Sequence, residues 1–259
     1  MRSLNRLVNS VLGSLGFRII PISREPHESS EMSPNTFDNF TSLAIAYEQL
    51  HNENHGSGAI PADDLRPLLL SRLQGTRPGE AYHIIECLSL TKSIRGDVCE
   101  FGVAQGETSA LIANEIRDTD KVLHLFDSFQ GLSKPTGKDQ LRDDIFSLGS
   151  IEAYEGSMAY PQKAVLSSLA ALQFPEDRLV IHPGFIETTI STDAQLPNHI
   201  SLAYIDFDLY QPITTALRFV AEALLPGGVI IVDDYDHFST GAKIAVDEFF
   251  SEQNVRGET

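Results

Sequence analysis

Two short apolar segments late in the chain end in aspartates. The segment YIDFDLY (204–210) contains Asp206, and the segment IIVDDYD (230–236) contains Asp233 and Asp234. If both segments are neighbouring strands of one parallel sheet, the three carboxylates meet at the same edge, where each raises the pKa of the others unless a cation is present. Oxygen ligands without histidine or cysteine favour Mg²⁺, Ca²⁺ or Mn²⁺ over zinc. The pattern therefore predicts an acidic site for a hard divalent cation.

Other polar residues near these segments are weaker candidates. We expect Asp208 to cap the helix that begins near Pro212 rather than to bind metal, because Asp and Pro are favoured at helix starts. His237 follows in the loop after Asp236 and could reach a substrate, although most loop histidines are only solvated. For His182, in a loop expected to lie near the substrate, a structural and a functional role are both open.

An earlier apolar run leads into a glycine-containing turn, EFGVAQGETS (100–109). Gly102 and Gly106 allow a tight turn and a close approach of the backbone to a ligand, and the following helix offers free N–H groups. The turn is neither a GxGxxG fingerprint nor a P-loop, so a dinucleotide or triphosphate ligand is weakly supported. A carboxylate at Glu100 suits a cationic or amine-bearing ligand better than a pyrophosphate.

The next apolar run ends in LFDSF (125–129), which places Asp127 27 residues after Glu100. An acidic residue there can accept hydrogen bonds from both hydroxyls of a ribose, although it can also simply cap the next turn. A glycine turn, an acidic second strand and no phosphate-binding chemistry together indicate a nucleoside without phosphates, and S-adenosylmethionine fits that description. The further candidate contacts are residues beside these turns: Thr108, Ser109, Ser128 and Ser157, the last of which could instead be a cap.

The elements that position these residues follow Gly96. Five apolar runs too short for helices alternate with helical segments, which predicts a parallel sheet with helices on both faces. Ligands of such sheets bind beyond the carboxyl ends of the strands. The expected strands are 98–103, 122–126, 179–181, 202–205 and 229–232, and the expected helices are 107–116, 162–172, 214–225 and 242–252.

The first third of the chain has a different character. Residues 3–15 have the apolar spacing of an amphipathic helix flanked by arginines, which indicates a weak contact with a membrane surface or, more commonly, packing on the same domain or in a dimer. We expect a homo-oligomer on this ground. Residues 23–35 form a polar linker or flap, and helices are expected at 37–54, 62–74 and 82–91. The resulting organisation is an amphipathic helix and linker (1–36), a helical cap or substrate region (37–92) and a cofactor-binding domain (93–259).

Composition excludes several classes of protein. The 259 residues are 42% hydrophobic with a formal net charge of −17, so the surface repels phosphate backbones and nucleic acid is not expected as a substrate. No apolar stretch is long enough to cross a bilayer, and the N-terminus does not have the pattern of a secretion signal. Cys87 and Cys99 lie in apolar runs without metal-binding spacing, which favours buried free thiols and a cytoplasmic location.

Five stretches together resemble the macrocin O-methyltransferase (TylF-type) family, which methylates sugar hydroxyls on natural products. They are GDVCEFGVAQGETS, LFDSFQGL, PGFIETT, YIDFDLYQPITTAL and LLPGGVIIVDDYDHFSTGAKIAVDEFF, and they cover most of residues 96–250. The resemblance implies a class I methyltransferase (Rossmann-like) fold with S-adenosylmethionine on the first two strands. It also implies Mg²⁺ held by Asp206, Asp233 and Asp234, with Asp206 as the general base that deprotonates a sugar hydroxyl.

The resemblance also implies an antiparallel hairpin after the last helix, closing the edge of the sheet. Because the sequence ends at Thr259, either this hairpin is missing or another segment covers the edge. Two other functions remain open at this point: a metal-dependent hydroxylase-like enzyme on the same scaffold, and a catalytically degenerate protein that only binds the cofactor. The acceptor and its methylated position are not specified by the sequence.

Overall fold

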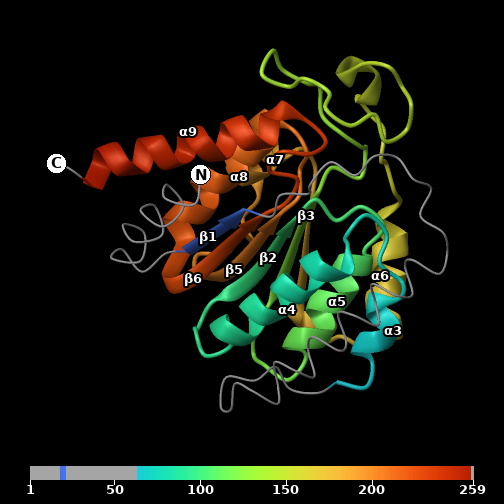
Figure 1. The fold of residues 1–259 in the computed structure, drawn as a ribbon. Coiled ribbons are helices and arrows are strands. Elements are labelled where there is room, and N and C mark those ends of the chain that lie inside the picture. The colour runs from blue at the N-terminus through green and yellow to red at the C-terminus, as the bar shows by residue number, and fades with distance from the viewer. Residues whose placement is uncertain (1–17, 22–62, 258–259) are drawn as a thin grey trace.

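The computed structural model describes residues 18–21 and 63–257. Within them, a twisted parallel sheet lies between two layers of helices (Figure 1). This is the α/β architecture expected from the alternation of short apolar runs and helical segments. The amphipathic helix at 3–15, the polar stretch at 23–35 and the helix at 37–54 lie outside the described residues. The membrane-surface contact and the homo-oligomer that rest on the first of these stay predictions.

The five expected strands are all present, and they are neighbours in a six-stranded parallel sheet. The strand order is β1-β6-β5-β2-β3-β4. Four of the five strands begin and end within two residues of the expected bounds. Strand β6 begins five residues earlier because it includes the PGG segment (226–228), across which its pairing with β5 shifts register. The strands are β2 (Asp97–Phe101), β3 (Leu123–Asp127), β4 (Leu179–Pro183), β5 (Ile200–Ile205) and β6 (Leu224–Val232).

The sixth strand comes from the N-terminal part of the chain. Strand β1 (Arg18–Pro21) pairs in parallel with β6, with Arg18 opposite Val229 and Pro21 opposite Val232. The sequence left two alternatives for this edge of the sheet, a missing hairpin or coverage by another segment. The structure has the second, since β1 covers β6. An exposed strand edge would be a template for association with other chains, and this pairing removes that hazard.

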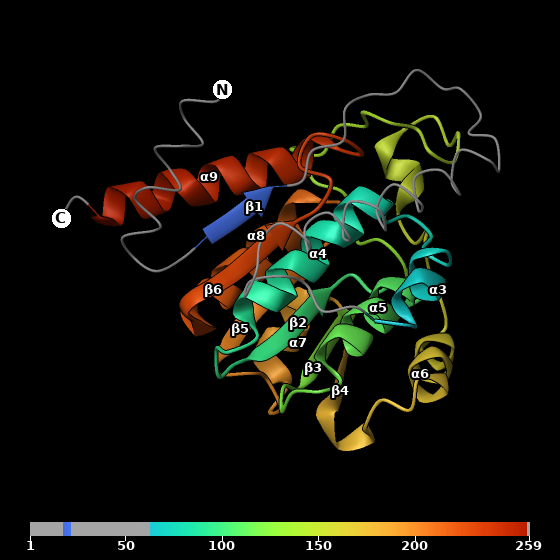
Figure 2. The same cartoon turned by 60° about the horizontal axis from the view of Figure 1, so that its bottom comes forward.

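One layer of helices consists of α3 (Arg66–Leu70), α4 (Pro78–Thr91), α5 (Glu107–Ile116) and α6 (Gln162–Ala171). The other consists of α7 (Ile186–Thr192), α8 (Tyr210–Ala223) and α9 (Thr240–Gly257). Figure 2 shows α4 lying across β5 and β6, which it contacts. Helix α3 has five residues where 62–74 was expected to be helical, and α7 replaces part of an expected polar loop.

Side chains along the strands alternate between the two faces of the sheet, as the two-residue period of a strand requires. In β5, Leu202 and Tyr204 pack with the layer of α4, α5 and α6, whereas Ala203 and Ile205 pack with α7, α8 and α9. Both faces are therefore apolar, which is why the strands read as continuous apolar runs. The expected buried thiols are confirmed, since Cys87 and Cys99 are both buried and free.

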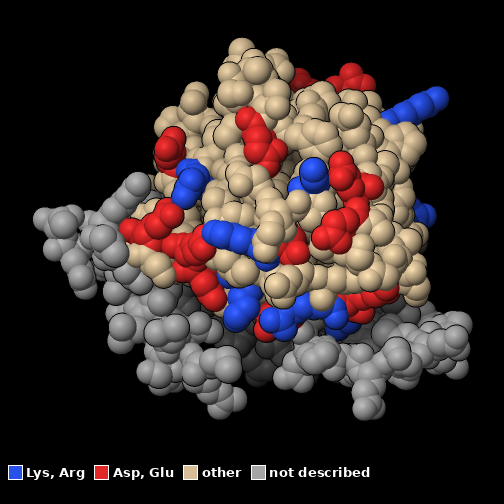
Figure 3. All heavy atoms as spheres, turned by 90° about the horizontal axis from the view of Figure 1, so that it is seen from above, with Lys and Arg blue, Asp and Glu red and all other residues tan. Residues whose placement is uncertain are grey.

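The described surface carries charges of both signs. Viewed from above Figure 1, acidic and basic side chains are interspersed and most of the face is uncharged (Figure 3). Among the described helices, none combines the length and the hydropathy needed to cross a membrane.

Candidate active site

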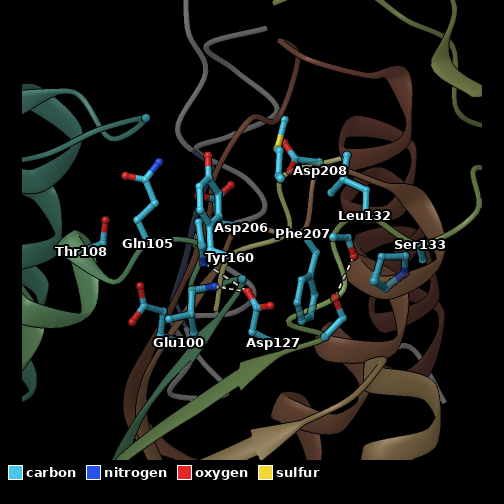
Figure 4. Close-up of a pocket in the computed structure, with 18 of the residues that line it drawn as sticks. Glu100, Gln105, Thr108, Asp127, Leu132, Ser133, Tyr160, Asp206, Phe207 and Asp208 are labelled. Carbon is cyan, nitrogen blue, oxygen red and sulfur yellow. Dashed lines mark hydrogen bonds between the residues drawn. The ribbon is translucent and has the colours of Figure 1, made fainter. Parts of the chain in front are cut away.

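A pocket of about 450 Å³ opens at the carboxyl ends of the strands. Its walls come from the segments that follow β2, β3, β4, β5 and β6, so residues far apart in the sequence share one cavity. In the view of Figure 4, Glu100, Gln105 and Thr108 lie on one side, and Leu132 and Ser133 on the other. This is the position that the strand order of a parallel sheet predicts for a ligand.

The glycine turn after β2 brings the two sides of the pocket into contact. Gly102 has φ +88°, and a Cβ at this position would overlap the backbone carbonyl oxygen of Asp206. Gly106 has φ +89° and stands directly before the first residue of α5. Glycine is required at 102 for two reasons, the left-handed backbone and the space that the β5 end occupies. The turn therefore fixes the distance between the glycine loop and the Asp206 segment.

Glu100 is fully buried at the end of β2 and lines the pocket. Neither of its carboxylate oxygens has a hydrogen-bond partner among the described residues. The pKa of Glu100 is raised to about 8, mainly by burial and in part by the charge of Asp127, although the Ser109 hydroxyl opposes the rise. An unsatisfied buried carboxyl is costly unless a ligand completes it, so this residue marks a place for a cationic or hydrogen-bonding group.

Asp127 lines the same pocket from the end of β3 and also holds the turns around it. Its Oδ2 accepts hydrogen bonds from the N–H groups of Val103 (2.8 Å) and Ala104 (3.1 Å), and its Oδ1 accepts one from Phe129 N–H (2.6 Å). The turn-capping role considered from the sequence is thus present. These hydrogen bonds do not use all of the acceptor positions of the carboxylate, which has about four lone pairs and can still accept a hydrogen bond from a ribose hydroxyl.

Only two of the four hydroxyl-bearing residues expected at the cofactor line the pocket. Thr108 and Ser128 line the pocket, whereas Ser109 and Ser157 are not among its lining residues. Ser157 instead contacts the loop that contains Gly131, since its backbone carbonyl accepts a hydrogen bond from the Leu132 N–H (2.9 Å). The lining residues of that stretch are instead Met158 and Tyr160, which the sequence interpretation missed.

Three aspartates that line the pocket lie close together, and Asp208 is among them in place of the expected Asp233. Carboxylate oxygens of Asp206, Asp208 and Asp234 all lie within 4.8 Å of one another. Asp208 joins them because the chain leaves the strand after Ile205 and turns sharply, with Leu209 N–H bonded to Phe207 O (2.6 Å) and Asp208 at φ +61°. The sharp turn was not visible in the sequence.

Asp233, expected in this cluster, is buried beside it and forms hydrogen bonds with Tyr204 and Asp234. Its Oδ2 accepts from the Tyr204 hydroxyl (2.5 Å), and its Oδ1 accepts from Asp234 N–H (2.8 Å). Burial raises the pKa of Tyr204 well above its ordinary value, and the charges of Asp206 and Asp233 add to this. Tyr204 therefore remains a hydrogen-bond donor, and its hydroxyl also lies 3.3 Å from Asp206 Oδ2.

The start of α8 is held by a residue from a distant loop instead of by Asp208. The side chain of Asp139 accepts the Tyr210 N–H (2.7 Å) through Oδ1 and the Thr136 N–H (2.7 Å) through Oδ2. No side-chain cap is found at the residue that precedes the helix. The expectation that Asp208 caps this helix is therefore wrong, and Asp208 is left to line the pocket.

Neither histidine singled out from the sequence lines the pocket. His182 is buried, with Nδ1 hydrogen-bonded to Asp193 Oδ2 (2.7 Å) and Nε2 to His124 Nδ1 (2.9 Å). Burial lowers the pKa of His182, although the hydrogen bond with Asp193 opposes this effect. His237 lies 3.5 Å from Asp143. For His182, the structural role is the one that the geometry supports.

The charged residues that line the pocket all have the same sign. Seven of its lining residues are acidic, and among the described residues that line it none is Lys, Arg or His. The acidic residues are Glu100, Glu107, Asp127, Glu187, Asp206, Asp208 and Asp234. Such a cavity favours cationic or neutral ligands and repels phosphates.

Fold and site together define an α/β protein of the class I methyltransferase type. Its backbone is similar to that of the O-methyltransferase NovP, with a TM-score of 0.59 and 20% identity over 85% of this chain and 92% of that one. It is also similar to CalS11, a calicheamicin methyltransferase, with a TM-score of 0.58 and 20% identity over 87% of this chain and 90% of that one.

Within this class, the chain belongs to the macrocin O-methyltransferase (TylF) family, whose model matches residues 62–258. A similar curated relative is the 8-demethyl-8-(2,3-dimethoxy-alpha-L-rhamnosyl)-tetracenomycin-C 4'-O-methyltransferase of Streptomyces olivaceus, 27% identical over 56% of this chain and 55% of its own length. Another is the mycinamicin III 3''-O-methyltransferase of Micromonospora griseorubida, 28% identical over 61% of this chain and 62% of its own. The chain thus spans less than two thirds of the length of these relatives.

Proposed function

We propose that this protein is an S-adenosylmethionine-dependent, divalent-metal-assisted O-methyltransferase that acts on a hydroxyl of a sugar or a glycosylated natural product. The observation that carries the proposal is one acidic pocket that is lined both by the buried carboxyl of Glu100, whose oxygens have no hydrogen-bond partner among the described residues, and by the cluster of Asp206, Asp208 and Asp234. Both curated relatives are O-methyltransferases according to their names, and the first name includes a rhamnosyl group on the acceptor.

The residues at the β2 and β3 ends fit S-adenosylmethionine. Glu100 offers a buried carboxylate to the ammonium of the methionine part, and an ammonium there would relieve the cost of its missing partners. Asp127 is placed to accept hydrogen bonds from ribose hydroxyls, with Thr108 and Ser128 on the same wall. The acidic lining suits a cofactor that is cationic at sulfur and has no phosphates.

The acid cluster fits a hard divalent cation, since its donors are all carboxylate oxygens within one coordination sphere of each other. We propose that Asp206 and Asp234 hold Mg²⁺ together with Asp208. Asp233, the third ligand implied by the family resemblance, would join them only if its bond from Tyr204 were released. As folded, Asp233 and Tyr204 fix the Asp234 segment against the end of β5.

A sugar hydroxyl has a pKa far above 7 and is a poor nucleophile until its proton is removed. When bound, S-adenosylmethionine supplies an activated methyl group, and the cation lowers the pKa of a hydroxyl beside it. Asp206 takes the proton of the acceptor hydroxyl as general base. The Gly102 turn holds Asp206 next to the cofactor wall, so that the oxygen and the methyl group can be aligned, and alignment accounts for much of the rate. We place this reaction in the cytoplasm.

The proposal is tested by two measurements on the full chain. Isothermal titration calorimetry should show binding of S-adenosylhomocysteine, the demethylated cofactor. An assay with radiolabelled S-adenosylmethionine and Mg²⁺ should then show methyl transfer to 4-nitrophenyl α-L-rhamnoside, a sugar chosen from the name of the tetracenomycin relative. Absence of cofactor binding would overturn the proposal. Binding without turnover on any hydroxylated acceptor would support the degenerate alternative instead.

A further inference from the structure

A buried tyrosine lies beside the acid cluster without lining the pocket itself. Tyr204 is fully buried in β5, two residues before Asp206. Its ring belongs to the same apolar cluster as Ile84 and Leu88 of α4 and Ile231 of β6, so the position of the phenol is fixed by packing. Because Tyr204 does not line the pocket, it can influence a ligand there only through the carboxylates that it contacts.

The Tyr204 hydroxyl has two carboxylates within reach but only one proton to donate. Its oxygen lies 2.5 Å from Asp233 Oδ2 and 3.3 Å from Asp206 Oδ2. Burial holds the pKa of Tyr204 well above its ordinary value, so the hydroxyl keeps this proton. The shorter distance is that of a charge-assisted hydrogen bond, and a single proton cannot serve both acceptors at full strength. The proton is therefore donated to Asp233.

The hydrogen bond from Tyr204 determines where the Asp233 carboxylate points. The backbone of Asp233 is fixed in the sheet, since its N–H donates to Ile205 O (2.8 Å). Only its side chain can turn, either towards the Tyr204 hydroxyl or away from it. The other carboxylate oxygen of Asp233 accepts the N–H of Asp234 (2.8 Å), which supports the orientation towards Tyr204.

The orientation of Asp233 decides how many carboxylates a cation at this site would meet. Oxygens of Asp206, Asp208 and Asp234 lie within 4.8 Å of one another, and Asp233 would add a fourth carboxylate. Mg²⁺ requires octahedral coordination and is usually bound by one or two carboxylates, with its other positions filled by water or substrate. A fourth carboxylate would bind the cation more tightly and would occupy a position that the acceptor needs.

We propose that Tyr204 is a positioning residue that withholds Asp233 from the cation and so keeps a coordination position open for the acceptor hydroxyl. The inference rests on the proposed function. It assigns Asp233 to the support of the site, and it makes the hydroxyl of Tyr204 the group that controls how tightly the site holds its metal.

A double-mutant cycle with Mn²⁺ as the probe tests the inference. Electron paramagnetic resonance measures the Mn²⁺ affinity of wild type, Tyr204→Phe, Asp233→Asn and the double variant, and it requires neither turnover nor an acceptor. Tyr204→Phe releases Asp233, so the affinity should rise about tenfold, a change typical of substitutions next to a metal ligand. Adding Asp233→Asn should remove this gain, although the same substitution has little effect in the wild type, so the two effects are not additive.

Tyr154→Phe is the matched control. Tyr154 is also a fully buried tyrosine whose hydroxyl donates to an aspartate, Asp144 (2.7 Å), and neither of these residues lines the pocket. This variant should lose stability without any change in Mn²⁺ affinity. Thermal unfolding of every variant checks the fold.

Proton nuclear magnetic resonance of the wild-type protein follows the same hydrogen bond directly. A hydroxyl proton in a short bond to a carboxylate resonates far downfield, and the signal of Tyr204 is identified by its shift in Asp233→Asn. The signal should persist when Mg²⁺ saturates the protein. Its loss on saturation would show that Asp233 turns towards the cation, which contradicts the inference.

The outcomes separate this inference from the proposed function. An unchanged or weakened Mn²⁺ affinity in folded Tyr204→Phe, or an equal effect of Asp233→Asn in both backgrounds, would overturn the role of Tyr204 while leaving metal binding and methyl transfer intact. A wild-type protein that binds S-adenosylhomocysteine but no Mn²⁺ would instead overturn the metal part of the proposed function, and the inference with it.

Discussion

The two sides of the pocket are built from the chain in different ways. The proposed cofactor side, formed by Glu100, Thr108 and Asp127, comes from one turn and the end of the next strand. The proposed acceptor side, formed by Asp206, Asp208 and Asp234, comes from segments that meet only in the folded sheet. Local segments can fix a generic nucleoside site, whereas distant ones leave the acceptor site free to differ without disturbing it. If this division is correct, variants on one side should leave the other side nearly unchanged.

The largest expected effect is on the acceptor side. Asp206→Asn removes the proposed base and a metal ligand, so kcat should fall by about 10² to 10⁴-fold. Calorimetry should find the affinity for S-adenosylhomocysteine within about threefold of wild type, because Glu100 and Asp127 are untouched. Near-normal turnover in the variant, or in the wild-type protein with excess chelator, would contradict the proposed roles of Asp206 as general base and as metal ligand.

Gly102→Ala should be the variant that damages both sides. A Cβ would overlap the Asp206 carbonyl, and alanine is strained at φ +88°, so unfolding free energy should fall by about 3 kcal/mol. Cofactor affinity and kcat should decrease together. Gly137→Ala is the control, since no atom lies within 4 Å of a Cβ there and no left-handed φ is required. Loss of only one function in Gly102→Ala would mean that this turn does not couple the two sides.

On the cofactor side, Glu100 should make ligand binding depend on pH. Its pKa of about 8 in the free protein lies above the ordinary 4.5, so at pH 7 a bound ammonium must drive out a proton. Affinity for S-adenosylhomocysteine should therefore rise about tenfold per pH unit below 8 and level off above it, whereas Glu100→Gln should bind weakly without this dependence. Calorimetry in buffers of different ionisation enthalpy measures the proton release. Binding without proton release at pH 7 would contradict the role of Glu100.

The same residue gives a stability prediction with a definite sign. Because its pKa is raised on folding, Glu100 contributes stability that is present below pH 4.5 and is lost as pH rises towards 8. In this window the free energy of unfolding should fall by about 1.4 kcal/mol per pH unit from this group. Thermal unfolding of the ligand-free protein should thus show Glu100→Gln gaining on wild type from pH 5 to 8. A constant difference would mean that Glu100 is already ionised.

The smallest effect separates the two candidate third ligands. Asp208→Asn should weaken Mn²⁺ binding, followed by electron paramagnetic resonance, by about tenfold, a loss typical for a metal site. Asp233→Asn should change it less, since Asp233 is bonded to Tyr204 and to Asp234 N–H. The opposite ranking would show that Asp233 turns towards the cation and that Asp208 does not.

Much of the fold could be predicted because its signals are local. Short buried strands such as β2 and β5 are continuous apolar runs, and helices such as α5 have their own apolar period, so their order alone implies a parallel sheet. The cofactor side follows from the same local information, since Glu100 and Asp127 end consecutive strands. Helix α7 was missed because its seven residues are too few to establish a period.

The acceptor side could be predicted only in outline. Strand order places Asp206 near Asp233 and Asp234, but which carboxylate faces the pocket depends on the turn at Asp208 and on the bond between Tyr204 and Asp233. Neither is encoded in the spacing. Asp139 has no sequence signal that distinguishes it from an ordinary loop residue, because its role depends on a contact with the distant start of α8.

The pairing of β1 with β6 also constrains the order in which the protein can fold. Arg18 and Val229 are about 200 residues apart in the sequence, so this edge can close only after almost all of the sheet has been synthesised. Contacts of such separation have a large loop-closure entropy and form late. During synthesis on the ribosome, β1 must therefore wait for β6 before it can pair with it.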